Sequence, residues 1–215
     1  MSISSEDLKS IREEYGNLPL ELFELHVTPA EQFENWFREA LEAKVKEPNA
    51  MVLATIKIDV PKARYVLFKG IEEEGIIFHT HYESAKAKEI QTNNSVATVF
   101  YWREIHRQVR VEGIVEEASK EISDNYFNTR PRGGQLSAIV SPQSQVIQSR
   151  KDIEKKIKNL DKEYEGIEIN RPDNWGGYLI KPTIWEFWQG REDRTHDRFR
   201  YQKVNNKWNI ERLAP

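Results

Sequence analysis

The hydrophobic pattern of this chain changes its period near residue 50, and that change limits the possible folds more than any other feature. Before it, apolar side chains recur at the three- or four-residue spacing of a helix. After it, apolar and polar side chains alternate with a period of two, which is typical of strands. The alternating segments are MVLATIKID, RYVLFKGI, GIIFHT, SVATVFYW and RQVRVEGIVEEA.

These strands predict an antiparallel sheet. VPKA and EEEG are short polar connections, which favours antiparallel neighbours. Further strand-like segments close the chain, namely YLIKP, TIWEFWQG, RFRYQK and KWNIERLAP. Strands with helices between and around them predict an α+β fold, an antiparallel barrel with peripheral helices. We expect one domain over residues 1–215, with a helical segment (1–48) ahead of the barrel (50–215).

The helices are predicted from their start and stop signals. A first helix is expected over residues 8–15. In the second, Thr28 is the N-cap, Pro29 takes the first helical position, Glu31 completes a capping box, and Pro48 ends the helix. Its apolar stripe is formed by Phe33, Trp36, Phe37, Leu41 and Val45. Later helices are expected in ESAKAKEIQTN, SKEISDNYFNTRP and RKDIEKKIKNLDKEYEG.

Composition excludes several classes of protein. A net charge of −3 lacks the basic excess of a general nucleic-acid binder. The chain has no cysteine and its five histidines are scattered, so we expect no disulfide, no thiol catalysis and no metal site. The N-terminus, MSISSEDLKSIREEYG, has no signal-peptide core, and no apolar run approaches the roughly 20 residues of a membrane helix. We therefore expect a cytoplasmic protein.

Several cations stand where they suit an anionic ligand. Arg64 and Lys69 lie five residues apart in one predicted strand and would point to opposite faces. Lys86 and Lys88 open a short predicted helix, where exposed backbone N–H groups also favour an anion. Solvated surface charge explains each of these pairs equally well.

Other polar side chains also suit an anionic ligand. Tyr126 and Arg130 lie four residues apart on a predicted helix and form a natural phosphate clamp, because arginine presents a planar fork of donors. The following RPRGGQ carries glycines that let the backbone approach a ligand closely. Gln143 and Ser144 suit a ring edge or a phosphate, and Gln108 shares a predicted strand face with Arg110. Tyrosine–arginine stacking on a surface and an ordinary polar loop are the alternatives.

The stretch WEFWQGREDRTHDRFRYQ, residues 185–202, combines rings with fixed charges. If the backbone is extended, Arg194, His196 and Arg198 point to one side. The acids among them (Glu192, Asp193 and Asp197) can neutralise such a cluster, so a surface role and a ligand role both stay open. The ligand, if there is one, is planar and anionic.

Seven phrases in order resemble the pyridoxamine (pyridoxine) 5′-phosphate oxidase family: RYVLFKG, FHTHYESAKAKEI, HRQVRVEG, YFNTRPRGGQLSAIVSPQS, WGGY, EFWQGREDRTHDR and ERLAP. The resemblance implies an FMN-binding split β-barrel that forms a homodimer, with the flavin between the subunits. It implies an enzyme of pyridoxine biosynthesis that oxidises pyridoxamine 5′-phosphate and pyridoxine 5′-phosphate to pyridoxal 5′-phosphate. O2 would be the acceptor and H2O2 the second product.

The same resemblance implies the site residues. FMN contacts would come from Arg64, Tyr65, Val66, Leu67, Phe68, Lys69, His79, Thr80, Lys86, Gln108, Gln143, Ser144, Trp188 and Arg198. Substrate contacts would come from Lys69, Tyr126, Arg130, Gly134, Arg194, His196, Arg12 and Tyr15. Arg194 and His196 would be the catalytic residues, and histidine suits proton transfer because its pKa lies near neutrality.

Some positions depart from the family pattern. Ala85 stands where an arginine usually precedes Lys86, Gly134 where a serine is frequent, and Thr195 where leucine is common. The missing arginine removes a charge-assisted hydrogen bond, worth roughly 1.5–3 kcal/mol, from the flavin phosphate. Two alternatives therefore stay open: a related FMN-dependent oxidase of the phenazine-pathway type, and a flavin- or pyridoxal-phosphate-binding protein with little turnover.

Overall fold

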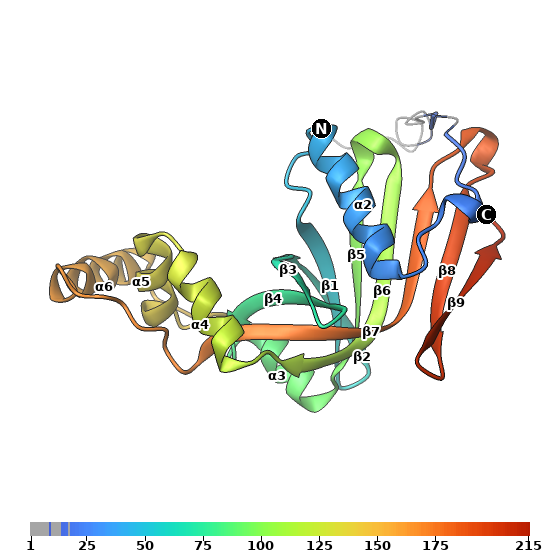
Figure 1. The fold of residues 1–215 in the computed structure, drawn as a ribbon. Coiled ribbons are helices and arrows are strands. Elements are labelled where there is room, and N and C mark those ends of the chain that lie inside the picture. Colours follow the sequence, from blue (N-terminus) through green and yellow to red (C-terminus); the bar gives the residue numbers. More distant parts are fainter. Residues whose placement is uncertain (1–8, 10–13, 17) are drawn as a thin grey trace. The chain divides into compact units, whose positions relative to one another are not determined.

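The computed structural model describes residues 9, 14–16 and 18–215 (Figure 1). The helix predicted over residues 8–15, and Arg12 with it, lies largely outside the described residues. The helices are α2 (Pro29–Glu42), α3 (Ala85–Thr92), α4 (Lys120–Thr129), α5 (Arg132–Val140) and α6 (Arg150–Glu163), with 3-10 turns η1 (Leu22–Glu24), η2 (Arg103–Ile105) and η3 (Glu192–Arg194). The strands are β1 (Ala50–Lys57), β2 (Val60–Leu67), β3 (Gly70–Glu72), β4 (Gly75–His81), β5 (Ser95–Trp102), β6 (Arg107–Glu117), β7 (Trp175–Gln189), β8 (Asp197–Val204) and β9 (Lys207–Leu213).

The strands form one sheet in the order β2-β1-β5-β6-β7-β4-β3, and β8 pairs with both β7 and β9. The pairs β1–β2, β3–β4, β4–β7, β7–β8 and β8–β9 are all antiparallel. The α+β class with an antiparallel sheet is therefore confirmed. None of the described helices is both long and apolar enough to cross a lipid bilayer.

The chain divides into two compact units. Unit 1 comprises Met1–Pro48, Val99–Val111 and Ile184–Pro215, and unit 2 comprises Asn49–Thr98 and Glu112–Thr183. Strands β5, β6 and β7 contribute residues to both units. The expectation of a single domain over residues 1–215 stays a prediction.

The core of unit 1 is aromatic and is organised by α2. The capping box is confirmed, since Thr28 Oγ1 accepts a hydrogen bond from the Glu31 backbone N–H at 3.3 Å. Phe33 is fully buried, and its ring centroid lies 4.9 Å from that of Phe100 and 5.4 Å from that of Trp185. A helix without this apolar face would be only marginally stable, because burial and not propensity supplies most helical stability.

The predicted end of α2 was wrong. The helix ends at Glu42, and Lys44 has a φ of 55°, so the chain leaves the helical path before Pro48. Leu41, predicted to lie in the apolar stripe, is 54% exposed. Val45 does bury its side chain, but from beyond the helix.

In unit 2 the first hairpin turns earlier than predicted. VPKA is not a connection, because β2 already begins at Val60 and pairs with Lys57. The turn consists of Ile58 and Asp59, whose φ values of 47° and 61° suit a two-residue hairpin loop. β2 then ends at Leu67, so Arg64 and Lys69 do not share a strand as predicted.

Two further elements differ from the prediction. Helix α5, which starts at Arg132 and contains both glycines of RPRGGQ, was not predicted; burial of Leu136 and Ala138 against Phe127 and Trp175 outweighs the low helix propensity of the glycines. The strands predicted in YLIKP and TIWEFWQG are one strand, β7, which continues through Pro182. Gly113 permits this, because a Cβ there would lie 2.3 Å from the Lys181 carbonyl oxygen.

Helices α4, α5 and α6 cluster at one end of unit 2 (Figure 1). Their core joins Phe127, Leu136 and Ala138 to Ile169 and Trp175. Packing of Phe127 into this core fixes the rotation of α4.

We expect Phe33→Ala to destabilise the protein by about 3–5 kcal/mol, because it leaves a large cavity among packed rings. Urea unfolding would measure the loss. Leu41→Ala, an exposed position of the same helix, is the matched control and should cost far less. Equal costs would contradict the assignment of Phe33 to the core.

Candidate functional site

A cavity of about 690 Å³ in unit 2 collects many of the predicted site residues. Those that line it are Tyr65, Val66, Leu67, Lys69, His79, Thr80, Lys86, Tyr126, Arg130, Gly134 and Gln143. They come from β2, the β2–β3 connection, β4, α3, α4, the α4–α5 connection (Arg130), α5 and the segment after α5. Residues far apart in the chain therefore meet in one hollow, as a ligand site requires.

Three stacked rings form a platform in this cavity. His79 stacks on Tyr126 with ring centroids 4.0 Å apart, and Trp175 lies parallel to both, 5.4 Å from His79. Two cations flank the rings: the Lys69 ammonium lies 5.3 Å from the Tyr126 ring, and the Arg130 guanidinium 4.6 Å from the Trp175 ring. The platform suits a planar anionic molecule.

Sequence reasoning missed Trp175 as a site residue. The phrase WGGY drew attention to the segment, but the indole was not assigned to the site. It lies opposite His81 at the start of β7, where β4 and β7 pair. The other lining residues missed are His81, Thr129, Pro131, Ser137, Ala138 and Ser141.

His79 is the most perturbed ionisable group of the cavity. Burial, and then the charges of Lys69, Arg130 and Arg171, together lower its pKa to about 4. The ring is therefore neutral at pH 7. Both ring nitrogens are buried and have no hydrogen-bond partner among the residues that the structure describes, so they have capacity for a polar group entering the cavity.

Lys86 marks one end of the cavity. Its Nζ donates to Thr80 Oγ1 at 3.0 Å and to Gln143 Oε1 at 3.2 Å. Burial, and then the charge of Arg64, lowers its pKa. Within the described residues Lys86 forms no ion pair, so its charge remains available for an anion.

Arg64, in contrast to Lys86, is paired with a carboxylate. Its guanidinium bonds to the buried Glu89 carboxylate, to Thr55 Oγ1 and to the Leu53 carbonyl oxygen. These contacts join α3 to β1. The hydrogen bond that Thr55 Oγ1 donates to Glu89, and then the charge of Arg64, hold the pKa of Glu89 down against the effect of burial. The described structure thus shows Arg64 as an anchor of α3, and its predicted contact with FMN is untested.

Unit 1 gathers a second set of predicted residues around Tyr15. Its ring packs edge-on against Trp188 at 5.5 Å and against His196 at 5.4 Å between centroids. His196 Nδ1 accepts a hydrogen bond from the Arg191 backbone N–H at 3.1 Å. In its neutral form His196 therefore carries its proton on Nε2. Burial and the charge of Arg194 lower its pKa.

The loop that carries these side chains is not extended, so the expected alignment of Arg194, His196 and Arg198 is wrong. Arg194 lies in η3 with a φ of 58°. The buried Asp197 carboxylate anchors the loop, since it accepts from Arg191 Nη1 at 3.0 Å and from the Leu20 backbone N–H at 3.1 Å.

Arg198 and Gln108 also lie in unit 1. Arg198 bonds through Nε and Nη2 to Oε1 of the buried Glu186, at 2.9 and 2.8 Å. Arg110 Nη2 holds the other oxygen of that carboxylate at 2.7 Å. Gln108, Trp188 and Arg198 are not among the residues that line the cavity of unit 2.

Comparison with known proteins identifies the family. The family model described as pyridoxamine 5′-phosphate oxidase matches residues 37–162. The model of the pyridoxine 5′-phosphate oxidase C-terminal dimerisation region matches residues 175–215. The pyridoxine/pyridoxamine 5′-phosphate oxidase of Salinibacter ruber is 48% identical over 97% of this chain and 99% of its own length. That of Aliarcobacter butzleri is 46% identical over 97% of this chain and all of its own.

The chain belongs to the pyridoxine/pyridoxamine 5′-phosphate oxidase family. Among solved structures, PhzG from Burkholderia lata, in complex with tetrahydrophenazine-1-carboxylic acid, has a TM-score of 0.88 and 28% identity, covering 94% of this chain and all of that one. An FMN-binding, oxidase-related protein of Nostoc punctiforme has a TM-score of 0.71 at 18% identity, over 89% of this chain and all of its own, and supports the fold alone. The family resemblance drawn from the seven phrases is confirmed.

The depressed pKa of His79 predicts how stability depends on pH in this family member. Between pH 6.5 and about 4 the unfolded chain binds a proton that folded His79 does not. Stability is therefore fully present above pH 6.5 and falls as the pH drops, by up to roughly 3 kcal/mol from this group. Urea unfolding at pH 7 and pH 4.5 should show a smaller loss for His79→Gln than for the wild type. Parallel losses in both proteins would show that His79 is not the group responsible.

Proposed function

We infer that this chain is an oxidoreductase that converts pyridoxamine 5′-phosphate and pyridoxine 5′-phosphate to pyridoxal 5′-phosphate, with FMN as its cofactor. Full-length identity of 44–48% to curated oxidases of these substrates carries the inference. The reaction serves the biosynthesis and salvage of vitamin B6.

The residues of unit 2 fit FMN. The flavin needs a cation and donors for its phosphate and flat partners for its ring system. Lys86, Gln143 and Thr80 cluster at one end of the cavity, and buried, unpartnered nitrogens of His79 lie within it. We assign the cofactor to Arg64, Tyr65, Val66, Leu67, Phe68, Lys69, His79, Thr80, Lys86, Gln143 and Ser144, together with Gln108, Trp188 and Arg198 of unit 1.

When bound, FMN supplies the two-electron oxidation of the substrate's C4′ carbon, and O2 takes up the electrons to give H2O2. The protein's own residues bind, orient and exclude water. This division of labour explains why no nucleophile motif occurs in the chain.

Lys69, Tyr126 and Arg130 would hold the phosphate of the substrate. Arg130 is fixed by its stacking on Trp175, and Gly134 lies beside it, since a Cβ there would lie 3.4 Å from the guanidinium, in contact with it. The Gly134 backbone N–H already bonds to Pro131 at 2.7 Å. The guanidinium fork and the phenol therefore contribute more to the substrate phosphate than Gly134 does.

Arg194 and His196 would act on the other side of the substrate. The Arg191 backbone leaves His196 Nε2 as a donor and sets the ring's orientation. A neutral ring with a lowered pKa can donate one hydrogen bond at Nε2 and handle a proton there. Tyr15, which packs against His196, and Arg12 are proposed to cover the substrate.

We further propose a homodimer with FMN at the subunit interface. The match of residues 175–215 to a dimerisation region supports dimer formation. A site completed by the second subunit would agree with the assignment of FMN contacts to residues of both units. The cytoplasmic location expected from the sequence stays a prediction.

Turnover tests the function directly. FMN-loaded protein mixed with pyridoxamine 5′-phosphate in air should form the aldehyde and H2O2 in equal amounts over many turnovers. Flavin-loaded protein that makes no aldehyde from either B6 phosphate would refute the proposed substrate. Oxidation of a tetrahydrophenazine carboxylate instead would favour the phenazine-type alternative, and no turnover would favour a binding protein.

Arg194→Ala should lower kcat/KM about 100-fold, the size typical of losing a group that orients or protonates the substrate. FMN content should not change. Arg200→Ala is the control and should keep its activity. It removes the guanidinium of Arg200 on β8, which forms a surface ion pair with Glu211 of β9. Unchanged turnover of Arg194→Ala would remove Arg194 from the site.

A further inference from the structure

A second cavity, of about 430 Å³, adjoins the first in unit 2. Gln143 lines both cavities, and its Oε1 holds Lys86 Nζ at 3.2 Å. Ser144, a predicted FMN contact, also lines this second cavity. The second cavity therefore begins where the cluster around Lys86 ends.

One face of α3 forms a wall of this cavity. Ala85, Lys88, Glu89 and Thr92 line it, and their spacing of three, four and seven residues places them on one side of the helix. Helical side chains lean toward the N-terminus, so Lys88 covers the turn that begins at Ala85. The Ala85 methyl group leaves that turn open to the longer lysine.

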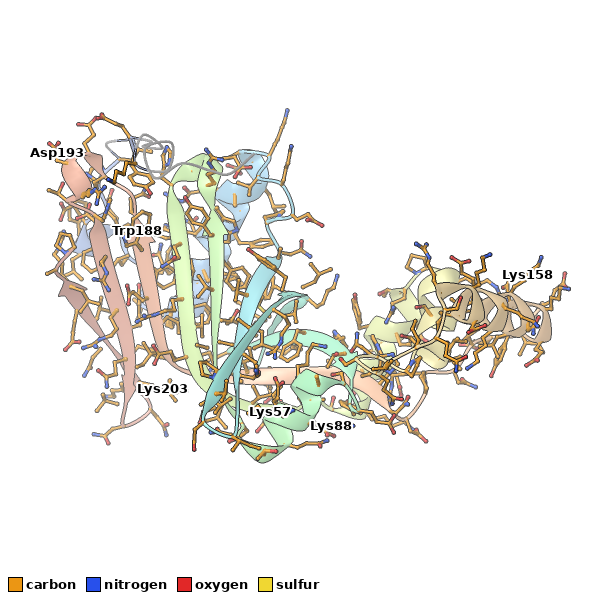
Figure 2. The ribbon with its side chains drawn as sticks, turned by 180° about the vertical axis from the view of Figure 1, so that it is seen from behind. Lys57, Lys88, Lys158, Trp188, Asp193 and Lys203 are labelled. Atoms are coloured by element: carbon orange, nitrogen blue, oxygen red, sulfur yellow. The ribbon has the colours of Figure 1, made fainter. Side chains whose placement is uncertain are left out.

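Lys57, at the end of β1, lines the same cavity. Figure 2 shows Lys57 and Lys88 beside α3. Both side chains are exposed, and within the described residues neither forms an ion pair or a hydrogen bond. The ammonium groups of Lys57 and Lys88 lie beside the polar cluster around Lys86, and they are available to an anion.

The acids of the cavity do not cancel this charge. Glu89 is committed to Arg64, with only 7% of its side chain exposed. The charge of Lys57 also helps to hold the pKa of Glu89 down, so Glu89 offsets part of it, and Glu83 is the second lining carboxylate. The N-terminus of α3 adds partial positive charge on the same side, since its first turn begins at Ala85 after the Ser84 cap. The cavity has a positive excess.

Lys86 alone is a weak match for a phosphate. A phosphate monoester carries about −1.5 to −2 charges at pH 7, whereas Lys86 is a single ammonium whose pKa burial lowers. Arg64, the next cation, is neutralised by Glu89. A phosphate bound at Lys86 therefore needs a further cation from the open side.

We propose that Lys88, assisted by Lys57, binds the phosphate group of the flavin from the second cavity and supplies the cation that Ala85 does not. This assignment rests on the proposed function, because it takes FMN as the cofactor. It gives the chain a cofactor contact one helical turn beyond the expected position. Glu83 opposes this contact.

Flavin titration of the apo-protein, followed by quenching of flavin fluorescence, tests the proposal. Lys88→Gln should weaken FMN binding about tenfold at low salt, and Lys57→Gln should weaken it less. Riboflavin, which lacks the phosphate, should bind both variants as it binds the wild type. Lys158→Gln, an exposed lysine of α6 (Figure 2), is the control and should bind FMN normally.

The compensating substitution Ala85→Arg gives a more specific test of the proposal. Ala85→Arg should tighten FMN binding and should largely abolish the effect of Lys88→Gln in the double variant, because either side chain then supplies the cation. FMN affinity unchanged by Lys88→Gln, or riboflavin affinity lowered as much as FMN affinity, would overturn the proposal. Either result leaves the proposed function intact, whereas wild-type protein that binds neither flavin refutes both.

Discussion

The close approach of β4 and β7 at two glycines is the constraint on which the candidate site depends. Gly177 lies opposite His79 and Gly176 opposite Thr80. A Cβ on Gly177 would lie 3.2 Å from His79 Nε2, and one on Gly176 would lie 2.0 Å from the Tyr82 hydroxyl. A side chain at position 176 would therefore clash with Tyr82, and one at position 177 would crowd His79. The Gly177 N–H also bonds to Ser123 Oγ at 3.0 Å, which ties α4 to the strand one turn before Tyr126.

Electrostatics divide the cations of the molecule into two groups. Some are neutralised by buried acids and hold elements together, as Arg64 does with Glu89 and Arg198 with Glu186. Others face cavities and form no ion pair with any carboxylate in the described part of the chain, as Lys86 and Lys88 do. Breaking a buried pair costs far more than losing a surface charge, because the remaining partner stays desolvated. The first group therefore fixes the positions from which the second can act.

Much of the fold could be predicted from periodicity and caps, and the errors share one cause. The start of α2 and most strands agree with their local signals, because Thr28, Pro29 and Glu31 act within one turn. The turn at Ile58 and Asp59 depends on the pairing of β1 with β2, whereas helix α5 and the continuity of β7 through Pro182 depend on neighbours distant in sequence. Local propensity disfavours each of them, and packing or strand pairing decides otherwise.

By itself, the sequence determined the α+β class, the family and the types of side chain available for a phosphorylated, planar ligand. These follow from short-range patterns and from phrases that keep their order along the chain. Only the tertiary structure decided which cations are paired with a carboxylate and which of the described ones are not. The burial of Glu89 beside Arg64, the stacking of Trp175 under Arg130 and the cavity between Lys57 and Lys88 join residues from separate elements. Charge pairing acts through space, so sequence spacing cannot reveal which partner each cation finds.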